Sequence, residues 1–148
     1  MRILTDQYTA GLFDGEGCVS IAKYYPIYSK TRLQYCLRVY ISSTNKEIIE
    51  TLKENYGGSW SIAKRPSKNK VGYNWNLATD QAYSFLKRIY PYLIIKKEQA
   101  DTAFAFVEFK KANVITRKRL GTEDAITNQH EVSYLQMRKL NQRGALVA

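Results

Sequence analysis

The sequence predicts an α+β fold in which helices cover one face of a four-stranded antiparallel sheet. Two segments alternate apolar and polar residues with a period of two, which is typical of half-buried hairpin strands. Segments with apolar residues at helical spacing precede, separate and follow these hairpins, giving the order αββαββα with extra C-terminal helices. At 148 residues we expect a single domain, 1–148, with a core at about 3–112 and a helical basic tail at about 113–148.

The first helix is expected at about 5–14. Thr5 is a good N-cap, and Asp6 is favourable in the first turn because its negative charge complements the helix dipole. Three glycines then fall within seven positions of the stretch TAGLFDGEGCVSI, which starts at Thr9, and each of them weakens a helix. We therefore expect the chain to turn sharply from helix to strand after Gly17, with glycine supplying the freedom for that turn.

The first hairpin has two distinct faces. Its strands lie on either side of Pro26, and the second of them covers about 33–42. The apolar face is formed by Val19, Ile21, Leu33, Tyr35, Leu37, Val39 and Ile41. The opposite face is formed by Ser20, Ala22, Tyr24, Gln34, Cys36, Arg38, Tyr40 and Ser42.

A second helix and a second hairpin follow. The capping box TNKE at 44–47 opens the helix, and Gly57 closes it. The hairpin strands are expected at 59–63 and 72–77, joined by a strongly basic turn at 64–70. Because both hairpins share one design, we expect them to pair into one sheet.

The remainder of the chain is predicted to be helical. Thr79 is expected to cap a third helix, which Pro91 breaks. A fourth helix is expected at 96–112, after which 113–127 has the composition of a loop. A last helix is expected at about 128–142, opened by the polar stretch NQHE.

The polar face of the predicted sheet suits a nucleic-acid partner better than plain solvent. It carries no carboxylate, and two-stranded ribbons fit the DNA major groove, where Arg, Gln and Asn read base edges. The predicted DNA-binding residues, including three in the basic turn, are Ser20, Tyr24, Gln34, Arg38, Tyr40, Ser61, Lys64, Arg65, Lys70, Asn74 and Asn76.

Composition narrows the partner and the compartment. The chain has 23 basic and 13 acidic residues, a net charge of +10, which favours nucleic acid or an anionic membrane surface over a merely soluble basic protein. Its 12 tyrosines suit nucleic acid better than lipid. No apolar stretch is long enough for a membrane helix and no signal peptide is apparent, so we expect an intracellular protein, in an organelle or in prokaryotic or phage cytoplasm. Cys18 and Cys36 fit reduced thiols rather than a disulfide or zinc site.

Residues 9–17, TAGLFDGEG, resemble the LAGLIDADG motif in its variant ending in DGEG, with Thr9 as the main departure. The segments ISSTNKEIIETLKENYGGSW, FLKRIYPYLIIKKEQADTA and LNQRG also resemble this family, so the likeness covers nearly the whole chain. Most members are homing endonucleases, and some are intron maturases. The resemblance implies a saddle-shaped sheet lying on double-stranded DNA, with two motif helices packed side by side.

The resemblance also implies a metal site and its residues. Each motif contributes one carboxylate, here Glu16, to a Mg²⁺ or Mn²⁺ site, and the carbonyl of Gly15 assists. Asp14 matches a structural acid that bonds backbone groups near the helix end. Lys96 matches an active-site lysine, with Lys97 as the alternative if the alignment slips by one residue. Ser43 lies where other members often carry a polar residue that positions a water molecule. Hard divalent cations held by carboxylates suit phosphodiester cleavage, because they activate water and neutralise charge on the phosphate.

The motif occurs once, so a second copy is expected to come from a second subunit, giving a two-fold homodimer. The small residues Ala10, Gly11 and Gly15 are expected to let the two motif helices approach closely, although the same residues could serve packing within one chain. The expected function is a homing endonuclease that makes a metal-dependent staggered double-strand cut in a long, nearly palindromic DNA site and so promotes intron or intein-type mobility. The alternative is an intron maturase or a relative that binds without cutting.

Other nuclease classes are disfavoured. Glu108-Phe109-Lys110 offers an E-x-K pattern, but in a helical context without an upstream acid, and an HNH nuclease needs more histidines than His130. A basic run without intervening acids could contact phosphates or simply be solvated: Lys110, Lys111, Arg117, Lys118 and Arg119.

Overall fold

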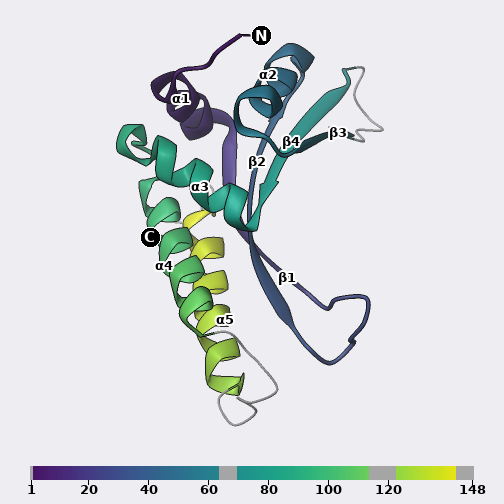
Figure 1. Cartoon of the computed structure of the whole chain (residues 1–148), viewed down its shortest axis with the longest axis vertical. Coiled ribbons are helices and arrows are strands. Elements are labelled where there is room, and N and C mark those ends of the chain that lie inside the picture. The colour runs from purple at the N-terminus through teal and green to yellow at the C-terminus, as the bar shows by residue number, and fades with distance from the viewer. Residues whose placement is uncertain (1, 64–69, 114–122, 143–148) are drawn as a thin grey trace.

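The computed structural model describes residues 2–63, 70–113 and 123–142. In chain order the elements are α1 (Asp6–Glu16), β1 (Gly17–Tyr24), β2 (Gln34–Ser43), α2 (Lys46–Tyr56), β3 (Ser59–Ala63), β4 (Gly72–Ala78), α3 (Thr79–Ile89), a 3₁₀ turn η1 (Tyr90–Tyr92), α4 (Lys97–Ala112) and α5 (Glu123–Leu140). The predicted αββαββα order with additional helices is confirmed (Figure 1). Among these described parts, no helix is both long and apolar enough to span a bilayer.

The four strands form one antiparallel sheet in the order β1-β2-β4-β3. The pairing register brings residues of like character into rows across the sheet. One row is apolar and consists of Gly17, Ile41, Trp75 and Trp60. The next row faces the other way and consists of Cys18, Tyr40, Asn76 and Ser59. The two faces predicted from alternation are therefore real faces of one sheet.

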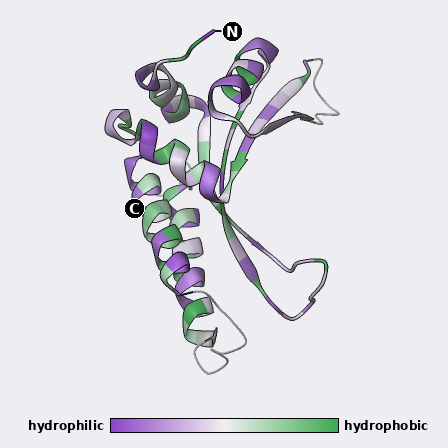
Figure 2. Ribbon diagram, in the orientation of Figure 1, coloured by the Kyte–Doolittle hydropathy of each residue, from purple (hydrophilic) through white to green (hydrophobic). Residues whose placement is uncertain are grey.

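Helices cover the apolar face of the sheet, and on the opposite face Cys36 is buried and lines a pocket with Phe106 and Lys110 of α4. Figure 1 shows α1, α2 and α3 against the apolar face at one end and α4 beside α5 at the other, while the tip of the first hairpin extends away from α4 and α5. Each helix mixes apolar and hydrophilic residues, as expected for elements that bury one face (Figure 2). The rest of the opposite face of the sheet is left uncovered in the part of the chain that the structure describes.

An aromatic cluster joins the first three helices to the sheet. Phe85 of α3 is its centre, with edge-on contacts to Phe13, Tyr56 and Trp75 at ring-centroid distances of 5.6, 5.0 and 5.2 Å. Trp75 and Phe13 have no exposed surface, and the indole Nε1 of Trp75 donates to the carbonyl of Gly57 at 2.8 Å. Such aromatic pairs contribute about 0.5–1.5 kcal/mol each beyond the area that they bury.

Two tight positions shape the connection between α2 and β3. Gly57 and Gly58 have φ values of +80° and +84°, which only glycine adopts without strain. A Cβ on Gly58 would also lie 2.3 Å from the carbonyl oxygen of Asn76. The sequence prediction that Gly57 ends this helix is confirmed, since its N–H bonds the carbonyl of Lys53.

The predicted starts of α2, α3 and α5 are wrong, and the first two concern the capping residue. The N-cap of α2 is Asn45 rather than Thr44, because the Asn45 side chain accepts from the amide of Ile48 at 3.2 Å. Thr79 does not cap α3: it is the first helical residue, with φ +52°, and the N-cap Ala78 makes no side-chain bond.

The last helix also begins earlier than predicted. α5 starts at Glu123, so the polar stretch at 128–131 lies inside the helix instead of opening it. There His130 is buried, and Glu131 accepts from the hydroxyl of Tyr35. These contacts to distant residues stabilise helix where local propensity favoured a cap.

Candidate active site and nucleic-acid interface

The end of α1 carries the two acids of the motif in different environments. Asp14 is buried, at 9% exposure, whereas Glu16, the last residue of the helix, is exposed. The helix runs to Glu16, two residues further than predicted, and Gly17 directly begins β1. Glu16 therefore stands at the junction between the helix and the sheet.

Asp14 connects this junction to the segment before α4. Its carboxylate accepts three backbone N–H groups, from Ile94 at 2.8 Å, Ile95 at 3.1 Å and Lys96 at 3.0 Å. The resemblance implies that Asp14 bonds backbone groups near the helix end, and these three bonds are of that kind. The carboxylate therefore fixes the chain on which Lys96 stands relative to α1.

Lys96 itself returns to α1. Its ammonium Nζ donates to the carbonyl oxygen of Asp14 at 3.0 Å, where the negative end of the helix dipole favours a cation. Lys97 is exposed and lies over the ring of Tyr90 instead, with Nζ 5.3 Å from the centroid. Of the two lysines, Lys96 is thus the one held at the α1 end beside Gly15 and Glu16.

One chain supplies an incomplete set of metal donors. Glu16 offers a carboxylate and Gly15 a carbonyl, hard oxygen donors of the type that Mg²⁺ prefers. Within 2–63, 70–113 and 123–142, no group of three or more His, Cys, Asp or Glu side chains could hold a metal ion. These two donors fill only part of the coordination shell of a divalent metal, so the remaining donors would come from a second molecule and from DNA phosphates.

The burial of residues along α1 shows that one prediction is wrong. Ala10 was expected on the side that meets a second helix, but it has no exposed surface and lies in the core with Phe13. Gly11 and Gly15 are exposed, and a Cβ added at either would meet no atom within 4 Å. The prediction for Ala10 is wrong because its position on the helix places it inward, on the same side as Phe13 and Asp14.

Gly17 also differs from expectation. Its φ of −84° and ψ of 166° are available to any residue, so the turn from α1 to β1 does not require glycine for conformational freedom. A Cβ there would instead lie 2.2 Å from the Phe13 ring. Gly17 is therefore explained by space beside Phe13.

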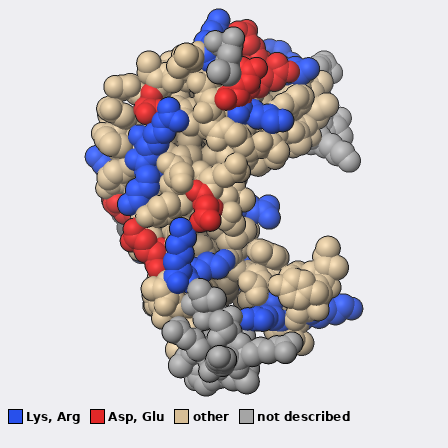
Figure 3. Space-filling view, viewed as in Figure 1, with Lys and Arg blue, Asp and Glu red and all other residues tan. Residues whose placement is uncertain are grey.

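The uncovered sheet face collects most of the predicted DNA-binding residues. The register places on this face Ser20, Tyr24, Gln34, Arg38, Tyr40, Ser61, Asn74 and Asn76. Lys70 is exposed at the start of the segment that leads into β4, whereas Lys64 and Arg65 lie outside the described residues. The strand residues on this face include no carboxylate. In Figure 3 the same side of the molecule is hollowed, and basic side chains project into the hollow and from its lower arm.

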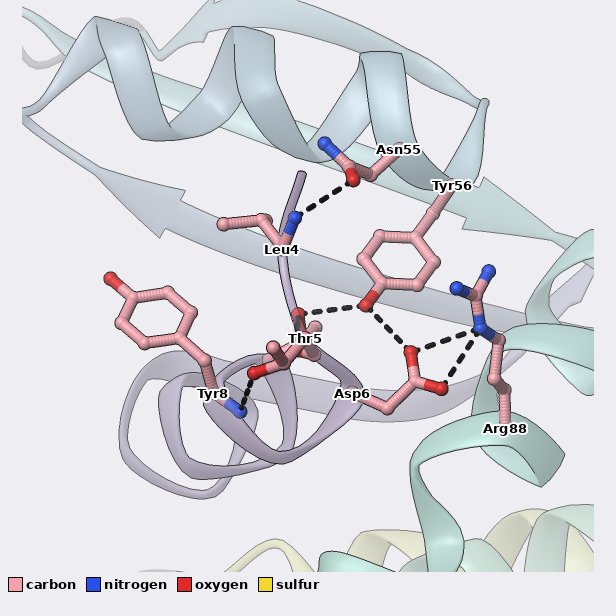
Figure 4. A network of polar contacts seen from close by, with 8 residues as sticks. Leu4, Thr5, Asp6, Tyr8, Asn55, Tyr56 and Arg88 are labelled. Carbon is pink, nitrogen blue, oxygen red and sulfur yellow. Dashed lines mark hydrogen bonds and ion pairs between the residues drawn. The ribbon is translucent and has the colours of Figure 1, made fainter. Parts of the chain in front are cut away.

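A polar network at the start of α1 was not predicted (Figure 4). The hydroxyl of Tyr56 donates to Asp6 at 3.1 Å and lies 2.8 Å from the hydroxyl oxygen of Thr9, and Arg88 pairs with Asp6 at 2.9 Å. Thr5 caps the helix as predicted, accepting from the amide of Tyr8 at 3.1 Å. The partners of Asp6 are separated from it by 50 and 82 positions, so no local pattern announces them.

A second unpredicted cluster fastens α5 to the first hairpin. Glu131 pairs with Lys23 at 2.8 Å and accepts from the hydroxyl of Tyr35. The hydrogen bond from Lys23, followed by that from Tyr35, lowers the pKa of Glu131, while burial raises the pKa of Tyr35. The side chain of Asn141 completes the attachment by donating to the carbonyl of Val19 at 2.7 Å.

Comparison with known proteins agrees with this geometry. A family model described as LAGLIDADG endonuclease matches residues 9–113. A search of curated proteins gives no match. Among solved structures, the homing endonuclease I-CvuI in complex with a DNA target and Mg has a TM-score of 0.72 at 16% identity, covering 96% of this chain and 85% of that chain.

Two further solved structures have the same fold. An archaeal intron-encoded homing endonuclease complexed with DNA has a TM-score of 0.71 at 16% identity, covering 97% of this chain and 87% of that one. The homing endonuclease I-TnaI has a TM-score of 0.61 at 15% identity, covering 95% of this chain and 100% of that one. At these identities the likeness shows a common fold over the described part of the chain.

Proposed function

The chain belongs to the LAGLIDADG endonuclease family, and on that basis we propose that it is a site-specific homing endonuclease. The reaction is a divalent-metal-dependent staggered double-strand cut in a long, nearly palindromic DNA site, and its biological outcome is intron or intein-type mobility. The observation that carries the proposal is the Asp14 linkage, which brings Glu16 and Lys96 to the same end of α1, next to a sheet face without carboxylates.

We propose Mg²⁺ or Mn²⁺ as the cofactor, held by the carboxylate of Glu16 and the carbonyl of Gly15. When bound, such a cation supplies an activated water and neutralises charge on the scissile phosphate. The ammonium of Lys96 stabilises the negative charge that develops on the phosphate or orders the attacking water. The relatives' structures with Mg and Ca support a divalent ion.

The active species is proposed to be a two-fold dimer. One chain brings one Glu16, whereas two chains joined through the exposed Gly11–Gly15 face of α1 bring two carboxylates to one axis. Each subunit then lays its open sheet face on one half of the DNA site. The free thiols Cys18 and Cys36 support a reducing, intracellular setting.

The test begins with selection of cleaved sequences from a randomised DNA library, which yields a target. Glu16→Gln is then compared with the wild type on that target in Mg²⁺. We expect Glu16→Gln to bind with wild-type affinity and to cut at least about 10²-fold more slowly, because the amide is a poor metal ligand.

Two results would contradict the proposal. Cutting at the wild-type rate by Glu16→Gln would refute the metal assignment, and a wild type that selects no cleaved sequence would refute the endonuclease. In the latter case splicing of a cognate intron RNA decides whether the protein is a maturase.

A further inference from the structure

A basic pocket lies away from the metal-binding end of α1. It is enclosed by the start of β2, the last turn of α4 and the middle of α5, and it is lined by Arg32, Gln34, Tyr35, Lys110, Asn113 and His130, together with Leu33. No acidic side chain of the described residues lines it. Three of its lining side chains are cationic or can become so.

His130 lacks a partner in this pocket. Its side chain is 5% exposed, and within the described parts of the chain its Nδ1 is the only buried side-chain nitrogen or oxygen without a hydrogen bond. The ring is enclosed by Tyr35, Phe106 and Phe109, at centroid distances of 5.7, 5.3 and 5.7 Å. Buried polar atoms are almost always paired, so a ligand that reached this nitrogen would supply its missing partner.

Lys110 brings a second incompletely compensated group to the pocket. Its half-buried ammonium donates to the carbonyl of Tyr35, and burial lowers its pKa. Burial and the nearby Lys110 also lower the pKa of His130. Glu131, the next residue along α5, is occupied by Lys23 and the Tyr35 hydroxyl and does not line the pocket. A bound anion would counter the positive charge of the half-buried Lys110.

We propose that this pocket binds a phosphate group, with the Nδ1–H of His130 and the ammonium of Lys110 donating to its oxygens and Arg32 lying at the rim. Donors of this kind make charge-assisted hydrogen bonds to phosphate. The pocket reaches Gln34, which is also on the open sheet face, so the phosphate can belong to a DNA backbone passing that edge. Free inorganic phosphate is the other source. Only the DNA source rests on the proposed function.

The chain has a single histidine, so the ring resonances of His130 report on the pocket without ambiguity. The full-length protein is titrated with inorganic phosphate, and separately with chloride at equal ionic strength. We expect a saturable shift of the ring ¹⁵N signals toward the Nδ1–H tautomer with phosphate and no such shift with chloride.

Lys110→Gln should weaken phosphate binding by about tenfold or more, because one charge-assisted hydrogen bond is lost. Lys111→Gln is the matched control: it removes the same charge one residue further along α4, where Lys111 pairs with Asp80 and does not line the pocket. Arg32→Gln, at an exposed site, gives a second test if Lys110→Gln fails to fold, and it should also weaken binding. Equal affinity in the wild type and in the folded pocket variants would overturn the proposal, as would the absence of a phosphate-specific shift in the wild type.

A mixed-sequence DNA duplex with Ca²⁺, which prevents cutting from complicating the spectra, identifies the source of the phosphate. If the duplex shifts the His130 signals and inorganic phosphate competes, the pocket takes a backbone phosphate. If free phosphate shifts them and the duplex does not, the pocket takes the free anion. Neither result depends on cleavage, so loss of the endonuclease proposal would leave this one standing.

Discussion

At the scale of single residues, two carboxylates two positions apart have different surroundings. Asp14 is buried and accepts three amide hydrogens, whereas Glu16 is exposed at the end of the helix. The sequence distinguished them through a family resemblance. The structure gives the physical distinction, since a carboxylate already committed to three donors has little capacity left for a metal.

Replacing Asp14 by Asn should lower the free energy of unfolding by about 2–4 kcal/mol, because an amide group sets its own N–H₂ against backbone donors. Glu16→Gln, at an exposed position, should change it by about 0.5 kcal/mol or less. Denaturant unfolding of both variants measures the difference. Equal changes in the free energy of unfolding would mean that the hydrogen bonds from the three backbone amides to Asp14 contribute little to the stability of the fold.

We expect His130 to make the folded protein less stable at acidic pH. Its folded pKa lies below the usual value of 6.5, because burial and then Lys110 disfavour the cation. The unfolded chain therefore binds the proton more readily, and stability should fall as the pH drops below about 6.5 toward the lower folded pKa.

Unfolding measured across this range should show the loss in the wild type and a flatter profile in His130→Phe. Glu131 does not blur the comparison, because its pKa is lowered from 4.5 and its contribution is lost only at lower pH. An identical slope in both proteins would assign the pH dependence to another group.

At the scale of elements, α1 has one buried face and one exposed face. Ala10, Phe13 and Asp14 face the chain's own core, and Gly11 and Gly15 leave an exposed strip one turn apart. Because a Cβ at either glycine meets nothing within 4 Å, packing within one chain gives no reason for glycine there. A facing helix in a dimer would supply that reason.

Gly11→Leu should therefore have opposite effects on folding and on assembly. Glycine costs a helix about 0.5–1 kcal/mol, so the isolated subunit should become more stable, while the added side chain should weaken the dimer by about tenfold or more. Analytical ultracentrifugation with and without target DNA measures assembly, and unfolding at low concentration measures stability. Glu54→Leu, an exposed site on α2, is the control for added apolar surface. A wild type that is monomeric both free and on DNA would end the dimer proposal.

The strands and the helix ends show what the sequence could and could not predict. All four strands and their faces follow from alternation, since a residue such as Val39 or Arg38 takes its side from its neighbours alone. The cap at Asn45, the unusual φ of Thr79 and the early start of α5 depend on geometry and on distant contacts such as Glu131 with Tyr35. For the site, the resemblance predicts roles for Glu16 and Lys96, and these stay predictions, but only the fold shows that Asp14 joins their two segments.

At the scale of the whole molecule, charge and shape act on the same side. A net charge of +10 creates a general attraction to polyanions, and basic side chains project into the hollow on one side of the molecule (Figure 3). Phosphate contacts position such a protein, and contacts to base edges specify the sequence.

Arg38→Ala and Lys70→Ala should separate these two contributions. Arg38 lies within the open face, so its loss should cost about 1–3 kcal/mol on the cognate site and relax preference at one base pair. Lys70 is the last residue of the basic turn at 64–70, so its loss should weaken binding to all DNA sequences alike. It should also reduce by about one the slope of the logarithm of the binding constant against the logarithm of the salt concentration. Binding to cognate and mixed-sequence duplexes at several salt concentrations measures both. If Arg38→Ala weakens every sequence equally, the sheet face positions the DNA and does not read it.

The pairing register has a further consequence, for redesign. Along each strand, residues that pack the core alternate with residues that face the hollow. Residues of one set can therefore be substituted without changing the other set. A combinatorial library confined to Ser20, Gln34, Arg38, Asn74 and Asn76 would therefore vary target preference while leaving Val39, Trp75 and Leu77 in place. Because no carboxylate on the strands has to be retained or balanced there, new DNA preferences could be sought without rebuilding the scaffold.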